Sequence, residues 1–496
     1  MNEPILNRIT EPRRRGIGRI LGVAGAVVMV VSAWLPWSYG AQALDDMTYL
    51  MGPSPLQLAF LGLGVILAAG LVLGTVQRLP GSLGRFGWRR AAATAATVAV
   101  VFAACCLAAI ALELGGLVNI NYGGWIALGG AAVGWFGTRL VPAGPEATVD
   151  SVRSSSWVQI LAIVAVMASA LFVAAYVLDI GDSGVFLVVS VLVVGAVFIL
   201  HRLGLTQWFR VAANDNRRVL ILAAFVVAFA FPFTQDGSNA NMSIAAQVLI
   251  FAATALGLNI AVGLAGLLDL GYIAFLGAGA FTAAILSKSA FATFMPWFKP
   301  PFIVVVLIAG SVAAILGLII GSPTLRVSGD YLAIGKICLR FQSDYLAIVT
   351  LAFGEIFRIS MNNLDGSDGP DITHGSDGIP GIPDLQLLGF DFGKSHVILG
   401  VEIGRFANYY WLMLLVLGLI ILVFVNLNNS RIGRGWVAIR EDEKAAEAMG
   451  VNPFALKLLA FAGGAFLAGV AGSVKAHMDI SVTPDQYIFL ESAFLL

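Results

Sequence analysis

The chain has 496 residues, of which 59% are hydrophobic and only 12% are charged, and its mean hydropathy is +0.89. Soluble domains carry about 25% charged residues, so this composition excludes an ordinary soluble domain and indicates a membrane protein. The formal net charge of zero says nothing about nucleic acid, but the sequence has no basic arm or stripe of the kind that binds phosphate. The 3 cysteines form neither a disulfide framework nor a metal-ligand spacing.

The N-terminus, MNEPILNRITEPRRRGIGR, is basic and leads into an apolar run at about 17–37. A bilayer crossing takes about 20 residues, so this run is long enough to span and too long for the core of a signal peptide. We interpret it as an uncleaved first span whose arginines stay in the cytoplasm.

Apolar runs of similar character recur along the whole chain. Each is expected to be a helix, because an open strand edge cannot survive in lipid. The expected fold class is therefore an all-α polytopic membrane protein with about 12–14 transmembrane helices, some of them short or discontinuous. The runs after the first lie at 55–76, 91–112, 124–141, 157–178, 184–200, 219–233, 243–266, 270–286, 302–321, 345–360, 409–426 and 455–475.

Lysine and arginine gather in alternate connecting segments when these runs are threaded with the N-terminus inside. Segments expected inside include QRLPGSLGRFGWRR, HRLGLTQWFRVAANDNRR, TLRVSGDYLAIGKICLR and RIGRGWVAIR, and segments expected outside include DIGDSG, TQDGSNANM and NNLDGSDGPDITHGSDGIPGIPDLQ. This alternation follows the positive-inside rule and predicts a cytoplasmic N-terminus. Lys288 and Lys299, which fall in a segment expected outside, are the exception.

The character of the sequence changes near residue 239. Up to about Phe233 the runs carry no ionisable residue near a span centre, whereas Gly-rich, discontinuous segments and acidic loops follow. We therefore expect two domains, a membrane extension of about seven spans at 1–238 and a second membrane domain at 239–496.

The stretch REDEKAAEAMG, which starts at Arg440, concentrates charges in an otherwise apolar part of the chain. Its spacing predicts one short helix with a charged stripe and a small apolar stripe, ended by Gly450, and Asn452 with Pro453 is expected to start the next helix. Two interpretations stay open, a solvated cytoplasmic loop or a helix that docks in a cleft on another protein. The charged stripe comprises Arg440, Glu443, Lys444 and Glu447, and the apolar stripe comprises Ala438, Ala445, Ala448 and Met449.

The longer segment RIGRGWVAIREDEKAAEAMGVNPFALKLLAFAGGAFLAGVAGS resembles the cytoplasmic coupling loop and following helix of binding-protein-dependent ABC permeases, and most closely the LivM-type permeases for branched-chain amino acids. The family pattern is Glu-Ala-Ala, three residues, then Gly, and Lys444 stands here in place of the leading Glu. The resemblance implies that this loop docks on an ATPase subunit. The implied coupling residues are Arg440, Glu441, Asp442, Glu443, Lys444, Ala445, Ala446 and Gly450.

Further stretches carry the same resemblance, in the family's order. They are ALGLNIAVGLAGLLDLGYIAFLGAGAFTAAIL, SPTLRVSGDYLAI with VTLAFGEIFRISMNN, and ITHGSDGIPGIP, where the family usually has Gly in place of His374. The likeness covers about residue 239 to the end, half of the chain. The first half is similar, much more loosely, to a membrane extension that some LivM proteins carry.

The Gly-rich pair of helices at 255–286 could line a substrate pathway, because glycine permits local unwinding that frees backbone groups to meet a carboxylate. Tight helix packing is the alternative, with Asp269 in a simple turn. Glu355 is the most suggestive charge in a span, and Arg358 one turn later could pair with it either structurally or within the pathway. The candidate pathway residues are Asn259, Gly263, Gly266, Asp269, Gly271 and Glu355.

Two features are expected to carry no chemistry. His374 is a lone histidine in an outside loop, for which turn chemistry is expected and no metal. GDYLAIGKI only superficially suggests a phosphate-binding loop, because Gly329 is one residue too far from Gly335 and Ile337 replaces the required Ser or Thr. The chain is therefore expected to bind no ATP and no cofactor, and to be no enzyme.

The resemblance implies a permease subunit of an ABC importer in a bacterial inner membrane, surrounded by lipid, that moves branched-chain amino acids into the cell. The implied partners are two cytoplasmic ATPase subunits, a second permease subunit of LivH type and a periplasmic amino-acid-binding protein. Alternatives are a permease for urea or short amides, an ion-coupled secondary transporter that uses Glu355 and Asp269, and a purely structural membrane fragment.

Two irregularities set the chain apart from the family pattern. TLRVSGDYLAI, from Thr324, recurs as CLRFQSDYLAI, from Cys338, and is expected to be a local duplication at the cytoplasmic face. The final YIFLESAFLL is too short to cross a membrane, and we expect a truncated product, because relatives continue through further Gly-rich spans.

Overall fold

In a computed structural model of the chain, the described residues are 5–40, 44, 53–74, 85–142, 144, 155–235, 238–287, 300–330, 342–366, 371–387, 389–398 and 400–495. Lys288, Lys299 and the start of the second copy of the duplicated stretch, 338–341, lie outside these ranges. The chain forms two compact units, Met1–Phe231 and Pro232–Leu496. The first unit ends seven residues before residue 238, where the sequence analysis expected the first domain to end, and α9 of the second unit starts at Asn239.

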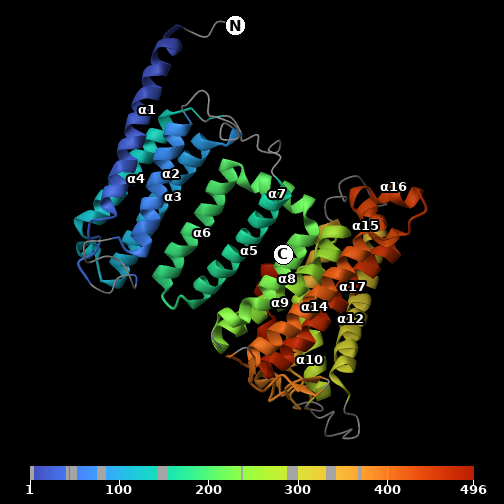
Figure 1. The fold of residues 1–496 in the computed structure, drawn as a ribbon. Helices are drawn as coiled ribbons and strands as arrows, with labels where there is room; N and C mark the ends of the chain where they lie inside the picture. Colours follow the sequence, from blue (N-terminus) through green and yellow to red (C-terminus); the bar gives the residue numbers. More distant parts are fainter. Residues whose placement is uncertain are drawn as a thin grey trace. The chain divides into compact units, whose positions relative to one another are not determined.

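The first unit is built from helices that local capping signals delimit (Figure 1). Ser54 and Gln57 form a capping box ahead of Pro55, Asn121 caps α4, and Asp182 caps α6. The helices are α1 Ile5–Ser32, α2 Pro55–Leu73, α3 Trp88–Glu113, η2 Leu117–Asn119, α4 Tyr122–Leu140, α5 Ser156–Asp179, α6 Ser183–Leu203, α7 Leu205–Asp215 and α8 Arg217–Ala230.

Small residues and aromatic rings together form the core of this unit. α1 packs against α4 so closely that a Cβ on Gly25 would lie 2.3 Å from the backbone nitrogen of Gly134. Such small-residue contacts let membrane helices approach closely. Phe60 packs edge-on against Trp37, with ring centroids 5.2 Å apart, and stacks on Phe102 at 5.9 Å.

The second unit surrounds the long helix α17 with α9, α10, α12 and α14. The helical elements are η4 Phe231–Thr234 at the boundary, α9 Asn239–Asn259, η5 Ile260–Leu264, α10 Ile273–Ser287, α12 Phe302–Asp330, α13 Gln342–Asn362, η8 Gly375–Asp377, α14 Arg405–Asn428, α15 Arg431–Glu441, α16 Glu443–Ala448, α17 Pro453–Asp479, η9 Pro484–Tyr487 and α18 Phe489–Leu495. The strands form three two-stranded antiparallel pairs, β1 Ile379–Pro380 with β6 Ser481–Val482, β2 Gln386–Leu387 with β3 Phe390–Asp391, and β4 His396–Ile398 with β5 Val401–Ile403.

Glycine contacts also bring the helices of the second unit together. A Cβ on Gly279 of α10 would lie 2.2 Å from the backbone oxygen of Gly469 of α17. Phe275 packs edge-on against Phe461 and Tyr272, with ring centroids 5.6 and 5.8 Å apart. The Gly-rich pair therefore packs tightly, as one of the two interpretations of the sequence expected.

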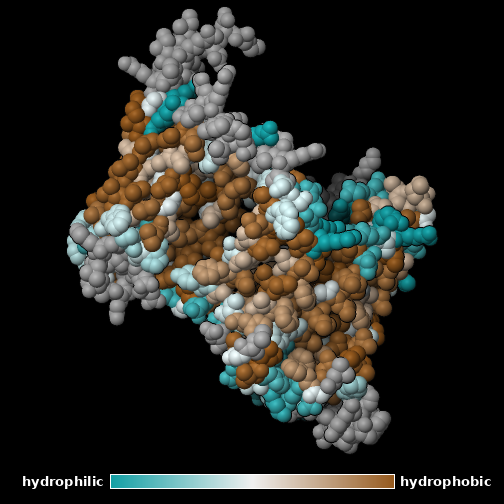
Figure 2. Space-filling view, in the orientation of Figure 1, coloured by the Kyte–Doolittle hydropathy of each residue, from teal (hydrophilic) through white to brown (hydrophobic). Residues whose placement is uncertain are grey.

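The structure confirms an all-α polytopic membrane protein with only a few short strands. Ten of the described helices are long and apolar enough to cross a membrane, and α10 is apolar but shorter. Within the second unit, hydrophobic side chains cover the sides of the helices and hydrophilic ones gather at the two ends (Figure 2). One hydrophilic end holds α15 and α16, and the other holds the strands (Figure 1).

The helix α12 is longer than the sequence analysis expected. The segment from Thr324 was expected to be an inside loop, but α12 continues to Asp330 through Pro323. Proline removes a helix hydrogen bond. The hydroxyl of the next residue, Thr324, donates to the Ile320 and Gly321 carbonyls at 2.7 and 3.1 Å.

Candidate functional site

The candidate pathway residues surround a break between α9 and α10. α9 ends at Asn259, a single π-turn follows over Ile260–Leu264, and α10 starts only at Ile273. Gly266 has a φ of +72°, a conformation that glycine adopts without strain. The expected local unwinding is therefore present, and π-turns inside helices occur frequently at functional positions.

Asp269 lies fully buried in this break. One of its carboxylate oxygens, Oδ1, accepts a hydrogen bond from the Gly271 amide at 3.0 Å, which fits a tight turn. The other, Oδ2, is buried without a hydrogen-bond partner among the described residues. Beside it, the Leu270 amide donates to the Thr350 hydroxyl of α13 at 3.0 Å. Asp269 therefore stabilises a tight turn through one oxygen, and its second oxygen is an unpaired acceptor within the described part of the chain, which is costly in a buried position.

Gly271 marks the closest approach between the break and α13. A Cβ at this position would lie 1.7 Å from the carbonyl oxygen of Thr350, which leaves no space for any side chain. The break is therefore clamped against α13, and Gly271 is a structural requirement of that clamp.

The helix α15 reaches the same break from the hydrophilic end of the unit. The Nη1 group of Arg440 donates a hydrogen bond to the carbonyl oxygen of Gly263 at 2.6 Å. A Cβ on Gly266 would lie 2.8 Å from Arg440 Cγ, so the arginine side chain lies directly across the glycine. The structure thus brings Arg440, a candidate coupling residue, into contact with Gly263 and Gly266, which are candidate pathway residues.

The expected single helix from Arg440 to Gly450 is wrong. The chain breaks at Asp442, which has an extended backbone with φ −154° and ψ 106° and separates α15 from α16. Its carboxylate accepts from the Ala445 amide at 3.0 Å, so Asp442 caps a new helix instead of continuing the old one. Arg440 therefore does not share a helical stripe with Glu443.

The joint between α16 and α17 agrees with the sequence analysis. Gly450 has the expected left-handed φ of +84°, and Asn452 caps α17 by accepting from the Ala455 amide at 3.1 Å, with Pro453 at the first position. Glu443 forms an ion pair of 2.7 Å with Lys457 of α17.

The apolar side of the loop is exposed for the most part. Ala445 is exposed, and Met449 is 84% exposed. Ala446 is buried, so it supports α16 from within and cannot face a partner. On the inner side, Trp436 is 1% exposed and donates from its indole nitrogen to the Leu456 carbonyl at 2.7 Å. The loop is therefore fastened to α17 while it presents small apolar side chains to its surroundings.

The expected pair of Glu355 and Arg358 forms, with Arg358 Nη2 2.5 Å from Glu355 Oε1. Arg358 also contacts Asp485 of η9 at 3.3 Å, a partner that the sequence did not indicate. The Glu355 side chain is 45% exposed, and the three side chains form an ion-pair network that ties α13 to η9.

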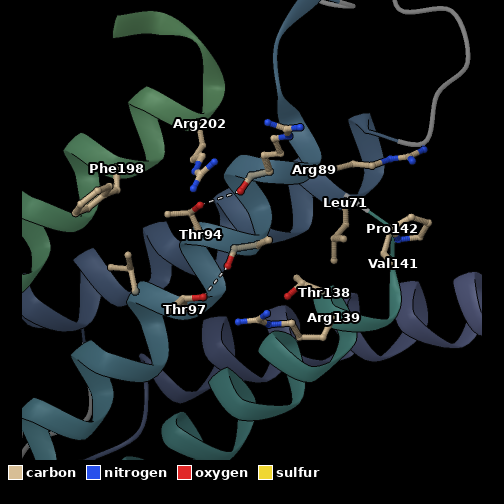
Figure 3. A pocket seen from close by; sticks show the side chains of 13 residues that line it. Leu71, Arg89, Thr94, Thr97, Thr138, Arg139, Val141, Pro142, Phe198 and Arg202 are labelled. Atoms are coloured by element: carbon tan, nitrogen blue, oxygen red, sulfur yellow. Dashed lines mark hydrogen bonds between the residues drawn. The ribbon is translucent and has the colours of Figure 1, made fainter. Parts of the chain in front are cut away.

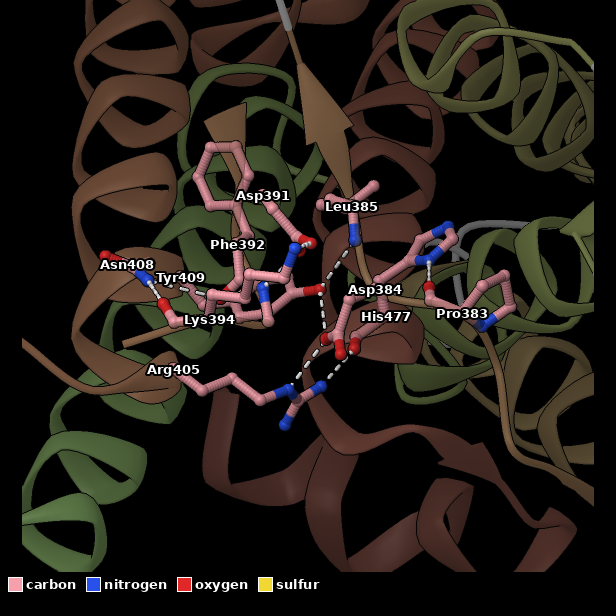
Figure 4. Close-up of polar contacts among 11 residues, drawn as sticks. Pro383, Asp384, Leu385, Asp391, Phe392, Lys394, Arg405, Asn408, Tyr409 and His477 are labelled. Atoms are coloured by element: carbon pink, nitrogen blue, oxygen red, sulfur yellow. Dashed lines mark hydrogen bonds and ion pairs between the residues drawn. The ribbon is translucent and has the colours of Figure 1, made fainter. Parts of the chain in front are cut away.

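A cluster around Arg405 fastens the strand-bearing segment to the helices (Figure 4). Arg405 forms an ion pair of 2.7 Å with Asp384 and donates to the backbone oxygen of His477 at 2.7 Å. The Tyr409 hydroxyl donates to Asp384 at 3.1 Å and accepts from the Leu385 amide at 3.1 Å. These contacts join the first turn of α14 to the last turn of α17. Together the two helix ends form one rigid support for the strand-bearing segment.

His374 has the turn role that the sequence predicted. Its ring Nδ1 lies 2.7 Å from an Asp371 oxygen, and its amide donates to the other oxygen at 2.9 Å. No group of side chains suited to a metal ion occurs among the described residues.

A polar cavity of about 440 Å³ lies at the strand-bearing end of the unit. Lys475 is 7% exposed and pairs with Asp479 one turn later, and Glu491 adds a second carboxylate to the wall. Phe251 and Phe406 supply apolar surface. A cavity with both charge signs and two aromatic walls suits a small zwitterion with an apolar side chain. The remaining lining residues are Ser243, Gln247, Ser481 and Gln486.

The sequence analysis missed this cavity, and none of the six candidate pathway residues lines it. Lys475 is the last residue of the apolar run at 455–475. The spacing of Lys475 and Asp479 could have revealed the cavity, because side chains four residues apart at the end of a helical span can form an ion pair.

Comparisons with known proteins support one family. The family model described as the permease component of the branched-chain amino acid transport system matches residues 241–494, just over half of the chain. Two curated proteins, both named high-affinity branched-chain amino acid transport system permease protein LivM, from Salmonella typhimurium and Escherichia coli, are 36% identical over 298 residues. The matches cover 57% of this chain and 62% of each relative, so the chain spans less than two thirds of their length. No solved structure gives a significant match.

Proposed function

Because the chain belongs to the family of permease components of branched-chain amino acid transport systems, we propose that it is a membrane-spanning subunit of an ABC importer for these amino acids. ATP hydrolysis falls to separate ATPase subunits in this proposal. A second permease subunit completes the passage and a periplasmic binding protein delivers the substrate. The chain then lies in a bacterial inner membrane with its N-terminus and α15–α16 in the cytoplasm.

The hydrogen bond between Arg440 and Gly263 is the observation that carries this proposal. Movement of α15 displaces the Arg440 guanidinium, and this displacement acts directly on the carbonyl of the π-turn between α9 and α10. The Glu443–Lys457 ion pair and the Trp436–Leu456 hydrogen bond pass the same movement to α17. One docked loop therefore moves both α17 and the break.

The exposed small side chains of the loop supply the docking surface. Ala438, Ala445 and Ala448 are exposed and offer little bulk, so they suit entry into a cleft. Charged side chains around them, with Lys444 in the place of the family's Glu, fix the orientation of the docked helix. Of the candidate coupling residues, Arg440 acts through its hydrogen bond to the break between α9 and α10. Asp442 caps α16, and the buried Ala446 supports α16 from within.

The polar cavity is the proposed substrate site at the outer end. The amino acid's carboxylate meets Lys475 and its ammonium group meets Asp479 or Glu491, while the apolar side chain packs on Phe251 and Phe406. Lys475 and Asp479 of the cavity lie in the last turns of α17, the end of that helix far from α16, as a site open to the periplasm requires.

The test is co-purification of the ATPase subunits with the chain, expressed together with its partner subunits. The variant Ala445→Arg places a long cation on the exposed face of α16 and is expected to release the ATPase subunits. Val397→Arg is the control, because Val397 is 76% exposed on β4 at the other end of the unit. Full retention of the ATPase subunits by Ala445→Arg would contradict the docking role.

A further inference from the structure

The first unit contains a cavity of about 830 Å³ whose wall is rich in arginine (Figure 3). The guanidinium groups come from the start of α3, the end of α4 and the end of α6, so three helix ends converge on one space. Arg139 and Arg202 are exposed at its mouth, and Arg89 and Arg90 are half-buried. The complete lining is Leu71, Arg89, Arg90, Ala93, Thr94, Thr97, Val98, Thr138, Arg139, Val141, Pro142, Phe198 and Arg202.

Among the residues that the structure describes, no acidic side chain lines this cavity. Arg89 Nε donates to the Gly74 carbonyl at 2.5 Å and Arg90 Nε to the Gly144 carbonyl at 3.0 Å, contacts that orient both side chains. Arg139 lies over the Trp135 ring at 5.0 Å. The described residues therefore leave a concentrated positive charge, and an anion in the cavity would relieve it.

Another arginine adds to this positive charge from α1. Arg19 lies close enough to Arg89 to repel it electrostatically. The Nε group of Arg19 is buried and has no hydrogen-bond partner among the described residues. A buried donor without a partner is costly, so this end of the unit has both excess charge and an unused donor.

A second, apolar cavity of about 540 Å³ continues from the first, and the two share Thr97, Val98 and Phe198. This cavity forms a groove between α3 and α6. At its floor Gly195 packs against Val98, so closely that a Cβ on Gly195 would lie 2.4 Å from Val98 Cγ1. From Phe198 to Phe186 the groove follows α6 for about 18 Å at 1.5 Å per residue. That length is close to one leaflet of a bilayer, about 15 Å. The other lining residues are Val101, Ser183, Leu187, Ser190, Val191 and Val194.

We propose that the arginine cavity and the groove together hold one anionic phospholipid. The phosphate lies among Arg89, Arg139 and Arg202, and an acyl chain lies along the groove between α3 and α6. Basic pockets between membrane helices suit anionic headgroups, and the loops that carry these arginines are those expected in the cytoplasm. The attached apolar groove of about 540 Å³ favours a lipid over a soluble phosphate, because inorganic phosphate has no apolar part to fill it.

The experiment measures lipid retained by the purified full-length chain, by native mass spectrometry after reconstitution in nanodiscs of mixed phosphatidylglycerol and phosphatidylcholine. The wild-type chain is expected to retain phosphatidylglycerol in preference to phosphatidylcholine. The double variant Arg139→Gln/Arg202→Gln is expected to lose this preference by roughly tenfold or more, since each basic residue near an anionic lipid contributes about a factor of five. Arg210→Gln/Arg218→Gln is the matched control, because both arginines are exposed and neither lines the cavity.

A second variant tests the groove without a change of charge. Ser190→Trp fills the groove and is expected to displace the bound lipid, whereas Ser169→Trp on the exposed face of α5 leaves it in place. Equal retention of both lipids by the wild-type chain would overturn the proposal. So would displacement of phosphatidylglycerol by millimolar inorganic phosphate alone, since the site would then be one for a soluble anion.

Discussion

The Arg440 guanidinium donates to the carbonyl oxygen of Gly263, 177 residues earlier in the chain, over 2.6 Å. The contact joins the last turn of α15 to the only π-turn among the described residues. A hydrogen bond from a charged group is worth about 1.5–3 kcal/mol, so it is strong enough to bias the conformation of a broken helix. In the proposed function, movement of the docked loop reaches the broken helix through this bond.

Arg440→Met removes the hydrogen bond and keeps the length of the side chain. We expect ATP-driven leucine uptake into proteoliposomes to fall by about tenfold or more, because the lost bond is worth about 1.5–3 kcal/mol. The ATPase subunits should still co-purify, because the exposed face of α16 is unchanged. Arg431→Met, an exposed arginine in the first turn of α15, is the control and should transport normally. Unchanged uptake by Arg440→Met would remove the coupling role of this bond.

Gly271→Ala tests the clamp between the break and α13. The new methyl group would meet the Thr350 carbonyl oxygen at 1.7 Å, so the backbone must move and the melting temperature in detergent should fall by several degrees. Gly463→Ala is the matched control, since a Cβ there meets nothing within 4 Å and alanine favours a helix. Equal melting temperatures for the two variants would show that α13 does not clamp the break.

Asp269→Asn distinguishes the ATP-driven mechanism from an ion-coupled one. The side-chain oxygen of asparagine can still accept from the Gly271 amide, so the turn is expected to persist. ATP-driven uptake should then stay close to that of the wild type. An ion-coupled transporter that used this carboxylate would lose transport in the variant, and such a loss in uptake assays, with folding intact, would favour that mechanism.

The local features of the site could be predicted from the sequence because neighbouring residues determine them. The left-handed Gly450, the Asn452 cap with Pro453 and the pairing of Glu355 with Arg358 follow from short spacings. The break at Asp442 was missed, because a capping carboxylate there competes with the continuation of the helix.

Contacts between residues far apart in the chain could not be predicted from the sequence. Nothing in the spacing of residues indicates that Arg440 meets Gly263, because the contact depends on how α15 packs in the folded unit. The cavity around Lys475 was missed for the same reason, since its walls come from α9, α14, α17 and α18. Side chains that converge from separate helices leave no short-range pattern.

The double variant Lys475→Met/Asp479→Leu tests the proposed substrate site. Removal of one partner alone would leave a buried unpaired charge and destabilise the fold by about 3–5 kcal/mol, whereas removal of both is tolerated better. We expect the double variant to fold, to bind the ATPase subunits and to lose leucine uptake. Its melting temperature in detergent controls for folding, and normal uptake at normal stability would place the substrate elsewhere.

Arg405→Met tests the support of the strand-bearing segment. Loss of the ion pair with Asp384 and of the hydrogen bond to the His477 backbone should loosen residues 379–403. Limited proteolysis from the outer side should then cleave this segment faster than in the wild-type chain. Lys394→Met is the control, because Lys394 is 75% exposed and its ion pair with Asp391 contributes little. Cleavage at the wild-type rate would show that Arg405 is not the support.

Accessibility of position 449 tests the central claim most directly, that α15–α16 faces the cytoplasm and docks on an ATPase subunit. Met449→Cys, in a chain whose own cysteines are replaced by alanine, places a thiol where the side chain is 84% exposed. A membrane-impermeant maleimide is expected to label it in inverted vesicles but not in intact spheroplasts, and bound ATPase subunits should protect it. Labelling in intact spheroplasts would place the loop outside the cell and contradict the account.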